Sequence, residues 1–150
     1  MKTLLFLLAS MVISGAANAQ FIATVQLDAP LEEMCGETLY ALFDGFDGQT
    51  GAKCDLSDQE LIDRMNEEIT WLREHPTFKA KGVMGVYINC EGKVIDSHSG
   101  LKDEDSELSK AIAAFLMENG NWKPGSFNGD EVDCSELIGF VIKKGKISLD

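Results

Sequence analysis

The sequence predicts an α+β domain, and three patterns carry that prediction. Two segments have apolar residues at helical spacing, one strand–turn–strand pattern spans 82–98, and one apolar run spans 132–142. In chain order these patterns give a helix, two strands, a helix and a strand. The predicted fold is therefore a ββαβ core that is preceded by a helix.

A signal peptide is predicted to precede this domain. Lys2 supplies a positive start, residues 4–13 are apolar, and Ala17-Asn18-Ala19 is a small-residue cleavage signal. The apolar segment is shorter than the about 20 residues that a membrane-spanning helix needs. We therefore expect a signal peptide over 1–19, a mature chain that starts at Gln20 without stable membrane insertion, and a periplasmic or secreted location.

Composition argues against several function classes. The 150 residues carry a formal net charge of −12, and an acidic surface repels phosphate backbones, so no nucleic-acid partner is expected. Four cysteines, none in a Cys-x-x-Cys pair, predict two disulfides in an exported chain, with no metal site and no cofactor. We divide the mature chain into a disulfide-tied extension, 20–56, and a folded domain, 57–150.

The extension gives weak local signals. Residues 21–28 alternate between two sets of side chains, which fits either a short strand or a flexible leader. The acidic, glycine-rich loop 43–51 lacks the ligand spacing and the closing Glu of an EF-hand. A solvated turn region is predicted there.

The folded domain is predicted to begin with a helix from Asp58 to Glu74. Ser57 and Glu60 form a capping box, in which each side chain reaches the backbone amide of the other residue. Pro76 ends the helix, because the residue before a proline avoids helical geometry. The apolar stripe at helical spacing is Leu61, Met65, Ile69 and Leu72.

A hairpin and a second helix follow. Strands are predicted over 82–90 and 93–98, because Glu91-Gly92 is close to the favoured Asp-Gly turn pair. The apolar face of the second helix includes Leu108, and Asn119-Gly120 provides a left-handed stop.

A connection rich in glycine introduces the last strand. Trp122-Lys123-Pro124-Gly125 and Asn128-Gly129 fix the chain path between helix and strand, and Trp122 is expected to close the end of the core. These residues are therefore assigned a structural role. The last strand is predicted over 132–142, and 143–150 is interpreted as a polar tail with a short final apolar pair.

Residue types that carry catalysis are sparse. Asp96-Ser97-His98 has the residue types of a hydrolase triad, but consecutive residues of a strand point to opposite faces. A zinc site built on Asp96 and His98 lacks the usual number and spacing of ligands. The sequence therefore predicts a protein that is not an enzyme.

Together, the segments resemble the C-terminal domain of TonB. The likeness covers about 58–142 and is closest to the Bacteroidetes branch of that family. It is carried by Gly82-Val83-Met84-Gly85-Val86-Tyr87-Ile88, Glu91-Gly92-Lys93-Val94, the helix around Leu108 and Ala111, Trp122-Lys123-Pro124-Gly125-x-x-Asn128-Gly129, and Ile138-Gly139-Phe140. The resemblance implies a three-stranded antiparallel sheet with helices on one face, in which the last strand lies beside the first and forms an edge.

In TonB proper, that edge pairs with an extended segment of outer-membrane transporters by strand addition. The resemblance thus implies a periplasmic protein-binding module linked to outer-membrane transport, with a TonB-dependent transporter as the expected partner. TonB proper also has a membrane anchor and a long proline-rich spacer, whereas this chain has a cleavable signal and only three prolines, so force transduction is not carried over. The implied partner-binding edge is Ser135, Glu136, Leu137, Ile138, Gly139, Phe140 and Val141. The alternative is a structural or interaction module that binds an unrelated partner or forms a homodimer through this edge.

The implied strand order also predicts the disulfides. If the first and last strands are antiparallel neighbours, Cys90 lies near Cys134, and the alternation of side chains places both on one face. This favours a Cys90–Cys134 bridge among the three pairings that four cysteines allow, and it leaves Cys35–Cys54 by elimination. Glu136 then falls on the inward face, where an acidic residue is unexpected.

Overall fold

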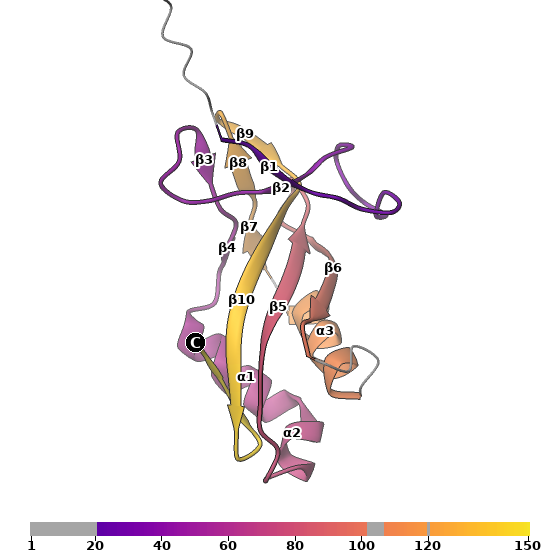
Figure 1. Cartoon of the computed structure of the whole chain (residues 1–150), viewed down its shortest axis with the longest axis vertical. Coiled ribbons are helices and arrows are strands. Elements are labelled where there is room, and N and C mark those ends of the chain that lie inside the picture. Colours follow the sequence, from indigo (N-terminus) through magenta and orange to yellow (C-terminus); the bar gives the residue numbers. More distant parts are fainter. Residues whose placement is uncertain (1–20, 102–106, 120) are drawn as a thin grey trace, which may run out of the picture.

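The computed structural model describes residues 21–101, 107–119 and 121–150. The predicted signal peptide with its cleavage site, and the helix stop at Gly120, lie outside the described residues. The described part of the chain forms a mixed six-stranded sheet, two small sheets and three helices. This is an α+β fold (Figure 1). The predicted α+β class is therefore confirmed. Among the described helices, none is long and apolar enough to cross a membrane.

The main sheet contains the three predicted strands and three more. The predicted hairpin forms β5 and β6, and the predicted last strand, β10, pairs antiparallel with β5 as expected. The prediction of a three-stranded sheet is wrong, because the extension adds β1 and β2 and the C-terminal residues add β11. The order is β1 (Ala23–Val25), β2 (Leu39–Ala41), β10 (Cys134–Lys143), β5 (Ala80–Ile88) and β6 (Val94–Ser99), with β11 (Lys146–Leu149) paired to β10.

A C-terminal hairpin stands where a polar tail was predicted. β11 pairs antiparallel with the end of β10, and the two strands are joined through Lys144 and Gly145. Both residues have positive φ, 54° and 68°, as a two-residue type I′ turn requires. The hairpin places Ile147 in the core at 2% exposure. Sequence reasoning missed it because Lys-Gly is not one of the strong type I′ pairs.

Three helices pack against the sheet. The capping box at Ser57 and Glu60 is confirmed, but the helix predicted over 58–74 is broken at Ile69, whose ψ is 92°. The break turns Ile69 into the core, where it is 4% exposed. The helices are α1 (Asp58–Glu68), α2 (Thr70–Glu74) and α3 (Glu107–Asn119).

Two small sheets join the extension to the folded domain. Short strands on both sides of Gly51 pair with the connection that begins at Trp122. The extension is therefore packed against the folded domain, and residues 23–25, for which a short strand or a flexible leader was predicted, form strand β1. The short strands are β3 (Gln49–Thr50), β4 (Lys53–Cys54), β7 (Trp122–Lys123), β8 (Gly125–Phe127) and β9 (Asp130–Val132).

The sheet has one covered face and one open face. On the open face, Val83 and Leu137 are 45% and 70% exposed. Side chains of alternating residues on the same strands enter the core with those of the helices, as period-two geometry requires. The inward side chains of β5 and β10 include Met84, Val86, Ile88, Phe140 and Ile142.

Candidate functional site

The predicted partner-binding strand, Ser135–Val141, lies inside the sheet. β5 pairs with β10 from Cys134 to Ile142 on one side. On the other side, β2 pairs with Cys134 and Ser135, and β11 pairs with Phe140–Lys143. The implied edge position of this strand is therefore wrong, because the extension and the C-terminal hairpin cover most of it. Among the described strands, none pairs with the second side of Glu136–Ile138.

This gap in the sheet offers few backbone groups. The amide of Tyr40 donates to the carbonyl of Asp133, and the amide of Asp150 donates to the carbonyl of Gly139. Backbone groups alternate in direction along a strand, so those of Leu137 also point into the gap. Leu137 is the one residue of the gap that presents both its N–H and its C=O there, which is little for a partner strand to pair with.

Glu136 lies beside the gap and points inward, as the alternation of side chains along the strand predicted. Its Oε1 is 2.6 Å from the place where a Cβ on Gly51 would stand, so the glycine makes room for the carboxyl. Burial raises the pKa of Glu136 to about 7; the amide of Ala52 acts against this shift, and the charge of Asp44 adds to it.

We expect Glu136→Gln to stabilise the protein at pH 8 and to have little effect at pH 4. The pKa of Glu136 in the folded protein lies above its ordinary value of 4.5, so ionisation costs stability as pH rises from about 4.5 through about 7. The full shift corresponds to roughly 3 kcal/mol, and partial exposure reduces the expected gain to about 1–2 kcal/mol. Urea unfolding at both pH values measures it. Glu131→Gln, at an exposed site, is the matched control, and an equal effect of Glu136→Gln at both pH values would contradict the prediction.

The connection that begins at Trp122 lies where the fold needs close packing. Trp122 is 8% exposed, and a Cβ on Gly125 would stand 2.8 Å from the Sγ of Cys134. Asn128 and Gly129 turn the chain with φ values of 54° and 92°. Lys123 ends β7, and Pro124 joins it to β8. The segment is thus a packed connection between α3 and β10.

The predicted disulfides are wrong: the structure joins Cys35 to Cys90, and Cys54 and Cys134 are free. Cys134 does lie opposite β5, but its partner there is Ile88. Cys90 lies beyond the end of β5, in the turn that leads to β6. The predicted pairing assumed a strand that continues to Cys90, two residues beyond the end of β5. In the structure the chain leaves the strand at Asn89. Burial raises the pKa of the Cys134 thiol to about 11, so it stays protonated at neutral pH.

Asp133 holds the disulfide region together. The residue is 2% exposed. Its carboxylate accepts hydrogen bonds from the amides of Cys35, Gly36 and Cys90 at 2.8–3.1 Å. The carboxylate therefore joins the extension and the β5–β6 turn to the start of β10. Sequence reasoning missed Asp133, since no local pattern distinguishes it from a surface acid.

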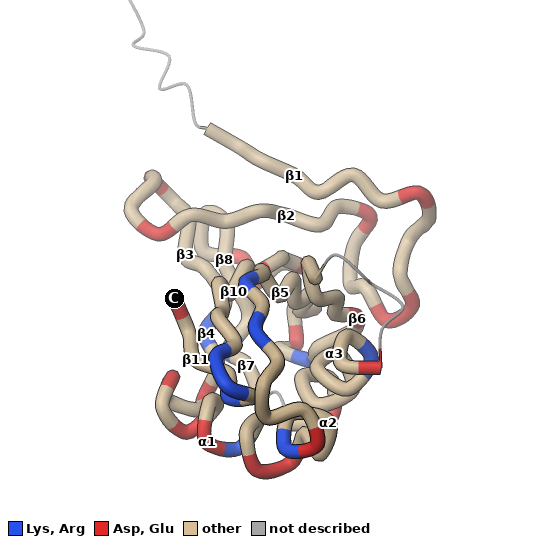
Figure 2. Tube along the Cα trace, turned by 60° about the horizontal axis from the view of Figure 1, so that its bottom comes forward, with Lys and Arg blue, Asp and Glu red and all other residues tan. Residues whose placement is uncertain are grey.

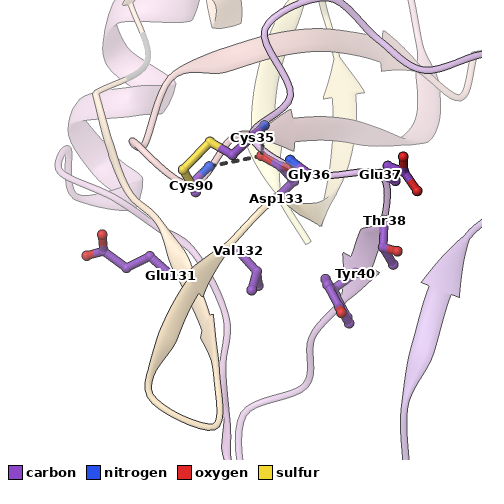
Figure 3. Close-up of a pocket in the computed structure, with 9 residues that line it drawn as sticks. All are labelled: Cys35, Gly36, Glu37, Thr38, Tyr40, Cys90, Glu131, Val132 and Asp133. Carbon is purple, nitrogen blue, oxygen red and sulfur yellow. Dashed lines mark hydrogen bonds between the residues drawn. A yellow bond between two sulfur atoms is a disulfide. The ribbon is translucent and has the colours of Figure 1, made fainter.

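A hollow of about 270 Å³ lies beside this junction. Figure 3 shows the residues that line it, with the disulfide and Asp133 side by side. One ligand atom from each of Cys35, Cys90 and Asp133 lies within 4.8 Å of the others, which is compatible in distance with a metal site. The two sulfurs are bonded to each other, however, and Asp133 already accepts three amides. In this state the cluster serves as a structural junction.

The triad residue types of β6 are not arranged as a triad. The Ser97 hydroxyl donates to the carbonyl of Ala113, while His98 lies edge-on to Tyr87 with ring centroids 5.4 Å apart. The side chain of Asp96 accepts the amide of Ser97. These contacts connect β6 to α3 and β5 and do not align a nucleophile with a base.

An open strand edge is found instead at β1, the outermost strand in Figure 2. The Tyr40 amide points toward β10, so the backbone groups of Leu39 and Ala41 point toward β1. Those two residues are the partners of Val25 and Ala23. The backbone N–H and C=O of Thr24, between them, therefore face outward.

Three phenylalanine rings lie at the start of this edge. Phe21, Phe43 and Phe46, here called the phenylalanine cluster, have ring centroids 5.3–6.1 Å apart. Each of the three residues is nevertheless 45–54% exposed to solvent. Gln49 holds the cluster together: its amide nitrogen donates to the carbonyl of Phe21, and its oxygen accepts the amide of Phe43. Contiguous exposed apolar side chains of this kind mark interaction sites.

Sequence reasoning left these residues unassigned. The alternation over 21–28 was visible, but its partner β2 lies in a segment with only weak helical spacing. Phe43 and Phe46 belong to the loop 43–51, for which the sequence predicts a solvated turn region. Comparison with known proteins adds no assignment: no family model, no curated protein and no solved structure matches the chain. The relation to the TonB C-terminal domain stays a prediction.

Proposed function

We propose that this protein is a non-enzymatic binding module that adds an extended segment of a partner protein to its sheet. The observation that carries the proposal is the open edge of β1 beside the phenylalanine cluster. In strand addition, backbone hydrogen bonds supply affinity, and pockets for alternate side chains supply selectivity. Thr24 offers the backbone groups, and the phenylalanine cluster offers an apolar surface next to them.

The proposed site differs from the one implied by the TonB resemblance. The β10 gap at Glu136–Ile138 is bounded by β2 and β11, whereas the outer side of β1 is bounded by no described strand. Figure 2 shows β1 on the outside of the fold, so a partner can approach it without displacing another segment.

The disulfide indicates an oxidising location outside the cytoplasm. Outside the cytoplasm, the predicted signal peptide and the TonB resemblance favour the periplasm. They also make extended segments of outer-membrane transporters the first natural partners to examine.

The proposal is tested with Thr24→Pro, which removes the outward amide and leaves the residues that pair with β2 unchanged. A displayed library of random nine-residue peptides is selected on the wild-type protein, and affinities of the enriched peptides are measured by fluorescence anisotropy. We expect Thr24→Pro to weaken binding at least tenfold, because it removes a backbone donor and places a ring at the edge.

Thr24→Ala is the matched control, since it removes the side chain and keeps the amide; it should bind as the wild type does. Leu137→Pro tests the β10 gap in the same way. Circular dichroism and Tm establish that each variant is folded. No enriched peptides, or equal binding by wild type and Thr24→Pro, would refute strand addition at β1. Loss of binding only in Leu137→Pro would show that the peptide binds at β10 instead. A stable dimer by light scattering, abolished in Thr24→Pro, would favour a homodimer instead.

A further inference from the structure

The charge of this protein is unevenly distributed around the proposed site. Residues 21–52 contain six acidic residues and no Lys or Arg. Figure 2 shows acidic segments at both ends of the β1–β2 pair and none along β1 itself. The open edge is thus an uncharged strip with acidic residues at its two ends.

Two of the six acids are neutralised within the fold. Glu33 pairs with Lys93, and Asp44 pairs with Lys53. The structure gives no ion pair for the other four in the described part of the chain. These four exposed residues are Asp28, Glu32, Glu37 and Asp47.

The unpaired acids lie close to the elements that would hold a partner strand. Asp28 and Glu37 line one hollow of about 350 Å³ together with Thr24. Asp47 follows Phe46 in the chain, at the phenylalanine cluster. The acids therefore flank the outward backbone groups of Thr24 on both sides.

We propose that the segment bound at β1 is cationic: an extended peptide with apolar side chains at alternate positions and Lys or Arg toward its ends. This inference rests on the proposed function and names the chemistry of its partner. Residues 21–27 span about 23 Å when extended, which matches a segment of about seven residues. Its apolar side chains contact the phenylalanine cluster, and its basic ends face Asp28, Glu37 and Asp47.

Charge argues against two other occupants. A second copy of this chain would bring the same formal net charge of −12 to the interface, so like charges would face each other. A membrane surface rich in anionic lipids would be repelled by the same acids. A cationic segment is the occupant that gains from both the apolar strip and its acidic ends.

The test uses the random nine-residue peptide library on the wild-type protein and reads the net charge of the enriched peptides. We expect enrichment of Lys and Arg, and affinities that fall as salt rises from 20 to 300 mM, roughly as screening of rim charges requires. The variant Asp28→Asn/Glu37→Gln/Asp47→Asn should bind enriched peptides about tenfold more weakly at low salt, as the loss of three rim ion pairs predicts.

The matched control is Glu67→Gln/Glu74→Gln/Glu118→Gln, which removes the same charge from exposed sites on the helices and should leave binding within about twofold. Enriched peptides that are neutral or acidic, or equal weakening by the two triple variants, would overturn the cationic partner while leaving strand addition intact. An absence of any peptide sensitive to Thr24→Pro would overturn the proposed function itself. The two failures are therefore distinguishable.

Discussion

Replacing Cys35 and Cys90 with serine is expected to lower the free energy of unfolding by about 4 kcal/mol. The bridge closes a loop with a sequence separation of 55 residues, and the loop-entropy relation gives about that value for such a loop. The loss should appear as a lower urea midpoint. The β1–β2 pair should lose protection from hydrogen exchange before the core does, because the bridge ties its connection to the β5–β6 turn.

Cys54→Ser is the matched control, since Cys54 is free and partly buried; it should cost about 1 kcal/mol or less. Peptide mapping without reduction supplies an independent test. Trypsin cuts after Lys53, Lys81 and Lys93 and so separates Cys35, Cys54 and Cys90 into different peptides. A linked pair that contains Cys134 would contradict the structure.

Replacing Asp133 with alanine is expected to cost about 3 kcal/mol. The change leaves the amides of Cys35, Gly36 and Cys90 without their acceptor, and a buried donor left unpaired costs roughly 1–3 kcal/mol. Cys35 and Gly36 are exposed, so water can bind their amides in the variant and limits the loss of stability. Urea unfolding measures the loss, and faster exchange of these three amides at pH 7 identifies its cause.

Two variants calibrate the Asp133 result. Asp133→Asn keeps one acceptor oxygen and the shape of the side chain, so its cost should be about half as large. Asp130→Ala removes an exposed acid on β9 and should change stability by less than about 0.5 kcal/mol. If Asp133→Ala were as mild as Asp130→Ala, the carboxylate would not be the junction between extension and sheet.

Local chemistry alone was enough to place much of this fold. The capping box at Ser57 starts α1, the glycine at 92 with φ of 83° turns β5 into β6, and period-two alternation identifies the inward side of β10. Each of these features depends on residues within a few positions of one another. Their outcome is therefore the same wherever the segment lies in the protein.

The sites are harder to predict from the sequence than the elements. Side-chain alternation places Glu136 on the inward face, but its pKa is raised by burial, against the opposing hydrogen bond from Ala52. Gly51, which makes room for the carboxyl, and Ala52 both lie far away in the sequence. The phenylalanine cluster depends likewise on Gln49, which joins the start of β1 to the loop after β2.

By itself, the sequence determined the helices, the hairpin, the core-facing side of the strands and the acidic character of the extension, because short-range geometry and composition decide these. Only the tertiary structure decided which cysteines pair and which strand forms the edge of the sheet opposite β6. Both depend on where the extension docks. Asp133 and the β2–β10 pairing fix that position through contacts between residues 90 or more positions apart in the chain. Such contacts leave no periodic pattern in the sequence. Because the extension docks beside β10, the open edge on this side of the sheet belongs to β1 and not to β10 as predicted.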